Sequence, residues 1–117
     1  MEFDGFTIAL LLTNPDAPEL DEETRAAVQD AHLAHLADLH AAGVLLAAGP
    51  LSDPEGRLRG LSILNVDHDE ARRLNEQDPA VQAGIFIIET LPWLVPAGAL
   101  SLSPTFFPRS VADVRGT

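Results

Sequence analysis

The chain has no cysteine and only seven basic side chains against 18 acidic ones. Without cysteine, disulfides, thiolate zinc sites and a cysteine nucleophile are excluded, and a cytoplasmic location is permitted. The formal charge of −11 repels phosphate groups and anionic lipid headgroups, so neither nucleic acid nor a membrane surface is an expected partner. The sequence also has no apolar run of about 20 residues, the length that a transmembrane helix requires. We therefore expect a cytoplasmic globular protein.

A chain of 117 residues, 46% of them hydrophobic, is large enough for one domain with its own core. We expect this domain to span residues 1–93. Residues 94–117 contain several prolines, which exclude a long helix, but they also carry Phe106 and Phe107. This extension is too apolar to be a free disordered tail, so it should pack on the domain or on a dimer partner.

Turn and capping residues divide the domain into alternating elements. Asp21 is a candidate N-cap for a long helix, and Gly43 and Gly84 are candidate left-handed residues after helical segments. The expected strands are residues 6–13, 44–48, 58–66 and 85–91, and the expected helices are residues 22–42 and 70–77 with a helical turn at 79–83. The order βαββαβ predicts an α+β, ferredoxin-like fold, an antiparallel sheet with two helices on one face.

The other face of such a sheet would be unusually apolar. The outward positions include Ile8, Leu10, Leu12, Ile63, Ile85 and Ile87. Contiguous apolar surface of this kind marks an interaction site. We therefore expect a homodimer in which two copies pack sheet against sheet.

His32 is the first candidate for chemistry. At about 100° per residue, Val28, Leu33, Leu36 and Leu39 form one apolar stripe on the long helix, and His32 lies near its centre. A lone histidine on an apolar face is more often a hydrogen-bonded core residue than a catalytic one. The pattern alone favours that interpretation.

A zinc site is an alternative use of the same helix. His32 and His35 have the i, i+3 spacing that lets two histidines share a metal, and Asp78 is a candidate third ligand. No HExxH or similar motif completes the set. We therefore predict no metal and no cofactor, and keep zinc as the minor alternative.

Three further polar residues have both a local and a functional interpretation. Asp78 precedes Pro79 and can cap a helical turn, or it can hold His32 in one tautomer if the two side chains meet. Ser52 follows Gly49 and Pro50 in a loop, where it is a turn residue or a ligand contact. Arg25 lies on the inner stripe of the long helix, where it can neutralise a bound carboxylate or phenolate or pair with Glu22.

Three stretches resemble the YciI-like (YCII-related) family: HLAHLADLHAAGVLLAAGPL, RLRGLSILNV and QDPAVQAGIFIIETLPW. The resemblance covers roughly residues 6–93 and implies a ferredoxin-like fold of the dimeric α+β barrel type. It also implies a His–Asp dyad, which falls on His32 and Asp78, with no matching role for His35 or His40. Many relatives carry an arginine three residues before this histidine. This chain has Gln29 there, and Arg25 one turn away is the candidate replacement.

Two hypotheses follow. The first is a small cofactor-independent enzyme of the lyase or isomerase type, acting on a small organic acid or ring-derived compound. Its catalytic residues would be His32, which shuttles a proton, and Asp78, which orients it; its substrate-binding residues would be Ser52, Arg25, Gly49 and Pro50. The second is a noncatalytic module that binds a small ligand or another protein. A His32–Asp78 hydrogen bond at the wall of an open cavity favours the enzyme, and a sealed His32 favours the module.

Overall fold

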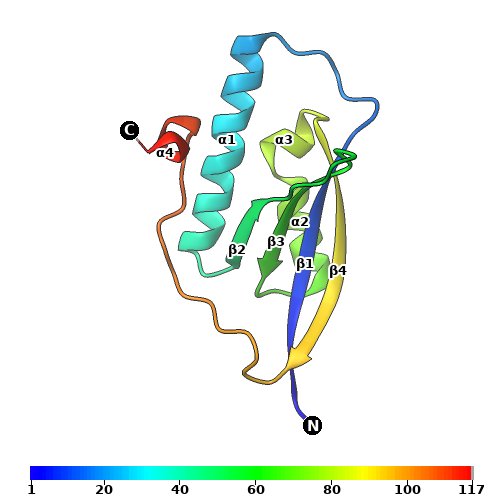
Figure 1. Cartoon of the computed structure of the whole chain (residues 1–117), viewed down its shortest axis with the longest axis vertical. Helices are drawn as coiled ribbons and strands as arrows, with labels where there is room; N and C mark the ends of the chain where they lie inside the picture. Colours follow the sequence, from blue (N-terminus) through cyan, green and yellow to red (C-terminus); the bar gives the residue numbers. More distant parts are fainter. Residues whose placement is uncertain (117) are drawn as a thin grey trace.

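The computed structural model describes residues 1–116 and arranges four strands and four helices along the chain (Figure 1). The order is β1 (Phe3–Thr13), α1 (Glu22–Ala41), β2 (Leu45–Pro50), β3 (Leu58–Leu64), α2 (His68–Glu76), α3 (Pro79–Gln82), β4 (Phe86–Pro96) and α4 (Val111–Arg115). The strands form one sheet in the order β2-β3-β1-β4, and every neighbouring pair is antiparallel. This order confirms the ferredoxin-like fold expected from the sequence.

Aspartates begin the three helices of the domain. The side chain of Asp21 accepts a hydrogen bond from the Thr24 N–H at the start of α1, and Asp67 does the same for the Glu70 N–H at the start of α2. Such caps satisfy amide groups that have no partner inside the helix. After α1 the chain turns at Gly43 with φ of +78°, a backbone conformation that glycine adopts without strain.

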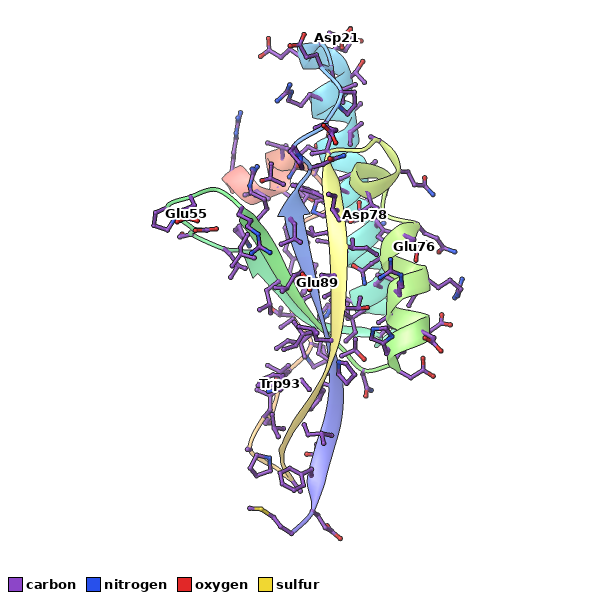
Figure 2. The ribbon with its side chains drawn as sticks, turned by 90° about the vertical axis from the view of Figure 1, so that its right-hand side faces the viewer. Asp21, Glu55, Glu76, Asp78, Glu89 and Trp93 are labelled. Carbon is purple, nitrogen blue, oxygen red and sulfur yellow. The ribbon has the colours of Figure 1, made fainter. Side chains whose placement is uncertain are left out.

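Helices α1, α2 and α3 cover one face of the sheet, as Figure 2 shows from the β4 side. Along β1, Thr7, Ala9 and Leu11 are buried beneath them, whereas the alternate residues of the strand remain partly exposed. This alternation is the period of two that a strand with one covered face must have. The fully buried core consists of Ala9, Leu45, Leu64 and Ala71, surrounded by Leu36, Leu39, Val44, Ala48, Val66 and Phe107.

Strands β1 and β4 are longer than their sequence patterns predict. The Pro92-Trp93 pair was expected to end the last strand, but β4 continues to Pro96 and pairs with a β1 that begins at Phe3. Proline has no backbone N–H, so it interrupts the hydrogen bonds of a strand that has neighbours on both sides. Because β4 is an edge strand, its only neighbour in the sheet formed by residues 1–116 is β1, and the strand continues past Pro92.

The chain after β4 runs back along the molecule toward the upper part of α1. Figure 1 shows it leaving the lower end of β4, passing outside β2 and bringing α4 beside α1. The last residue of the expected extension, Thr117, lies outside the described residues. Within residues 1–116, no helix is both long enough and apolar enough to cross a membrane. The cytoplasmic location stays a prediction.

Asp53 organises the loop between β2 and β3. Its carboxylate accepts hydrogen bonds from the backbone N–H groups of Leu58 (2.9 Å), Glu55 (3.1 Å) and Arg57 (3.0 Å). The bonds from Leu58 and Glu55 contribute most to lowering the pKa of Asp53 below its ordinary value of 3.8. A carboxylate held in this way stabilises the loop only while it is ionised.

We therefore expect Asp53→Asn to lower the melting temperature at neutral pH. The lowered folded-state pKa means that the stabilisation is fully present above pH 3.8 and is lost as the pH falls through the folded-state value. Thermal unfolding followed by circular dichroism should show the gap between wild type and variant closing in acid. Glu55→Gln, in the same loop, is the control and should show no such gap at neutral pH. A gap that persists unchanged in acid would contradict this account.

Candidate active site

His32 and Asp78, 46 positions apart in the sequence, are hydrogen-bonded in the structure. Nδ1 of His32 lies 2.7 Å from Oδ2 of Asp78, and the two residues are 7% and 1% exposed. An aspartate carboxylate only accepts hydrogen bonds, so Nδ1 must carry the proton. In the neutral ring this leaves the lone pair on Nε2.

Different atoms of Asp78 serve the fold and the histidine. The residue lies between α2 and α3, on the helical side of the sheet in Figure 2. Oδ1 accepts a hydrogen bond from the Ala80 N–H at 2.9 Å and caps α3, while Oδ2 contacts His32 on α1. The local interpretation of Asp78 as a helix cap and its pairing with His32 are therefore both correct.

The free edge of His32 faces open space. Within residues 1–116, the His32 side chain forms one hydrogen bond, through Nδ1. In the same residues every fully buried side-chain nitrogen or oxygen has a hydrogen-bond partner, so Nε2, which has none, is not fully buried. His32 also lines a cavity of about 410 Å³. The ring of Phe86 on β4 packs edge-on against the imidazole, with 6.0 Å between ring centroids, and holds its orientation.

The cavity lies between α1 and the sheet, and its walls come from α1, all four strands and the C-terminal segment. Most of the lining is apolar, with a few polar groups, as in typical small-molecule sites. The lining residues are Gln29, His32, Leu33 and Leu36 of α1; Leu11, Ala48, Gly49, Pro50, Arg59, Gly60, Leu61, Ser62 and Phe86 of the strands; and Phe107, Pro108 and Val114 of the C-terminal segment.

The charge of the cavity is opposite to that of the chain. Although the chain has 18 acidic residues, none of those in the described part lines the cavity. Arg59 is the one lining residue there with a permanent positive charge, and its guanidinium carbon lies 5.7 Å from the centroid of the Phe86 ring. A cation at this distance from an aromatic face is attracted to it. Phe86 thus contacts both His32 and Arg59.

The YCII-related domain family matches residues 8–94, about three quarters of the chain. The chain belongs to this family. The match includes both His32 and Asp78 and ends before the end of β4. The C-terminal segment that completes the cavity lies outside it. No curated protein matches the chain.

A solved structure shares the fold of this YCII-related protein. It is 5-chloro-2-hydroxyhydroquinone dehydrochlorinase (TftG) from Burkholderia phenoliruptrix AC1100, in complex with 2,5-dihydroxybenzoquinone. The TM-score is 0.54 and the sequence identity 22%, and the similarity covers 80% of this chain and 95% of that one. At this identity the comparison establishes the common fold.

Two residues expected at the site lie elsewhere. Arg25 is exposed. The first turns of α1 extend beyond the sheet, so the side of the helix that the helical wheel predicts to face inward has no core to contact there (Figure 1). Ser52 is also exposed, in the loop whose tip, marked by Glu55 in Figure 2, bends away from the helices. Neither is among the described residues that line the cavity, whereas the expected Gly49 and Pro50 are.

Arg59 and Ser62 are lining residues that sequence reasoning missed. Leu11 pairs with Gly60 and Leu12 with Leu58, so Arg59 is an extra residue in β3. A bulge of this kind redirects a side chain, and strict alternation gives no sign of it. Ser62 did carry a signal, because it occupies an inward position of β3, two residues from the buried Leu64.

The other histidines of α1 have structural partners. Nε2 of His35 lies 3.0 Å from the carbonyl oxygen of Leu74, and Nδ1 of His40 lies 2.7 Å from that of Leu45. Within residues 1–116, no three histidine, aspartate or glutamate side chains are grouped closely enough to hold a metal ion. The His32–His35 zinc alternative therefore has no complete ligand set in that part of the chain.

Proposed function

We propose that this YCII-related protein is a lyase-type enzyme, working without a cofactor, that uses the His32–Asp78 pair to move a proton on a small ring-derived substrate. The observation that carries the proposal is the dyad itself, with Nδ1 bound to a buried carboxylate and Nε2 accessible at the wall of a cavity. A sealed core histidine would lack that accessible nitrogen. The dehydrochlorinase activity named for TftG agrees with this reaction class.

In the proposed elimination, Nε2 of His32 removes a proton from the substrate. The electrons of the broken bond form a new double bond within the substrate, and the leaving group departs with its bonding pair, as chloride would in a dehydrochlorination. The imidazolium is stabilised by the Nδ1–H bond to Asp78, and Nε2 then releases its proton to water. Asp78 accordingly orients the ring and balances the charge that develops on it.

Arg59 is proposed to bind the anionic group of the substrate, in place of Arg25. It is the cation that the cavity presents, and no carboxylate lines the cavity within residues 1–116. Its guanidinium and the His32 ring both pack against Phe86. A carboxylate or phenolate can be bound there by charge-assisted hydrogen bonds. Ser62 and Gln29 supply further hydrogen-bonding groups, and Gly49 and Pro50 shape the wall.

Replacing His32 should greatly slow turnover without unfolding the chain. General acid–base catalysis contributes about 10²- to 10⁴-fold, so we expect His32→Ala to lower kcat by about that factor. Asp78→Asn should lower kcat as well while keeping an oxygen that caps α3. The assay is chloride release from 5-chloro-2-hydroxyhydroquinone and related chlorinated phenols, with circular dichroism to check folding.

His35→Gln is the matched control for these variants, because His35 is on the same helix but binds the backbone of Leu74. It should alter stability without a comparable loss of kcat. Turnover that survives in both His32→Ala and Asp78→Asn would refute the enzyme hypothesis. Ligand binding at the cavity without turnover in the wild type would instead favour the noncatalytic module.

Removing the Arg59 charge should weaken substrate binding more than it slows the chemistry. We expect Arg59→Gln to raise KM for an anionic substrate about tenfold, equivalent to about 1.4 kcal/mol, with a smaller change in kcat. Arg57→Gln, two residues away and outside the cavity lining, is the control. Equal effects of the two substitutions would show that general surface charge, rather than Arg59, is responsible.

A second copy of the chain is the proposed partner of the open sheet face. Ile87 and Leu91 on β4 are 45% and 47% exposed, and they pair with Leu12 and Ile8 of β1. These residues leave apolar surface on the side that no helix covers, with the exposed Glu89, which pairs with Leu10, between Ile87 and Leu91. A homodimer that packs sheet on sheet would bury it and form the dimeric α+β barrel.

The dimer proposal predicts that Ile87→Arg gives a monomer. A charge placed beside Leu12 in a buried interface cannot be desolvated without large cost. Size-exclusion chromatography with light scattering should give the mass of two chains for the wild type and of one for the variant. Leu102→Arg, an exposed apolar position in the C-terminal segment, should remain dimeric. A monomeric wild type would overturn the proposal.

A further inference from the structure

Residues 105–114, here called the strap, are bound along the polar side of α1. The backbone N–H of Thr105 donates to Nε2 of His40 at 3.0 Å. Arg109 forms an ion pair with Asp38, and the N–H of Val111 donates to Asp30 at 2.9 Å. Side chains of α1 that would otherwise only face water thus hold the strap at three places along the helix.

Phe107 is the apolar anchor of the strap. Its ring stacks on His40, with 3.9 Å between centroids and 13° between planes, and it packs against the residues around the core. His40 is fixed from both sides, because Nδ1 binds the Leu45 carbonyl while Nε2 accepts from Thr105. Phe106, the preceding residue, is 75% exposed. The two adjacent phenylalanines therefore have different roles.

The strap forms part of the cavity wall. Phe107, Pro108 and Val114 line the same space as His32, although all three lie outside the family match, which ends at residue 94. With this wall present, the cavity volume of about 410 Å³ is near the lower end of the roughly 300–1,000 Å³ typical of small-molecule sites. The strap thus limits the space beside the dyad.

We propose that the strap is a specificity-determining wall that restricts the cavity to single-ring substrates. The inference rests on the proposed function, because it concerns the substrate of the same site. The stack on His40 and the three polar contacts of the strap with α1 hold Phe107 and Pro108 in place. A fused second ring needs more of the space that Phe107 and Pro108 bound than a flat monocyclic compound does, so the wall disfavours it.

The test compares binding of one-ring and two-ring quinones by calorimetry. Wild type should bind 2,5-dihydroxybenzoquinone at least tenfold more tightly than 2-hydroxy-1,4-naphthoquinone. In Phe107→Ala the small ring loses a contact and the large one gains room, so we expect this preference to fall about tenfold or more. Phe106→Ala, which removes an exposed ring of the same size, should keep the wild-type preference.

A second measurement needs no ligand. Diethyl pyrocarbonate modifies accessible imidazole nitrogens, and tandem mass spectrometry locates the modified histidine. If the strap bounds the cavity, modification of His32 should be several-fold faster in Phe107→Ala than in wild type or Phe106→Ala. An unchanged His32 rate overturns the proposal.

The binding experiment can also fail on its own. The specificity role is overturned if the wild type discriminates between the two quinones no better than Phe107→Ala does. It is also overturned if the wild type binds neither quinone. The proposed function is tested separately by loss of turnover in His32→Ala. A changed quinone preference with unaltered turnover in His32→Ala would leave the strap as a selectivity wall and remove the catalytic role of the dyad.

Discussion

The hydrogen bond between His32 and Asp78 is the contact on which the organisation of the site depends. Each side chain is buried, and a buried polar group left without its partner costs about 1–3 kcal/mol. Together the two groups satisfy one another across the junction of α1 and α3, and the second oxygen of Asp78 completes the start of α3. The bond that lets the pair be buried also places the proton on Nδ1. The stability of the fold and the availability of Nε2 as a base therefore have the same origin.

The cavity beside this pair differs in charge from the rest of the protein. A chain with a formal charge of −11 repels anions over most of its surface, yet the described lining has an arginine and no carboxylate. This arrangement depends on an irregularity in β3, where the extra residue of the bulge is Arg59. A single aromatic ring, Phe86, then contacts both Arg59 and His32. Packing on this ring, rather than a loop, therefore links the positions of the two side chains.

The two sides of helix α1 have different contacts. Its inner side supplies His32 and apolar residues to the cavity, and its outer side holds the strap through Asp30, Asp38 and His40. Since the strap lies outside the family match, the chain completes its cavity with residues that are not part of the shared domain. Such a division permits the shape of the cavity to change without disturbing the dyad, because the two are built from different segments.

The sequence by itself determined the fold class, the helix start at Asp21, and the inward direction of His32. Each of these follows from local spacing, since caps, glycine turns and the periodicities of helix and strand act within a few residues. The family resemblance then added the pairing with Asp78. Only the tertiary structure decided which arginine reaches the cavity, that Ser52 lies outside it, and that β4 continues through Pro92. Those outcomes depend on where α1 extends past the sheet, where β3 bulges and which strand lies at the edge, and all three are relations between segments far apart in the chain.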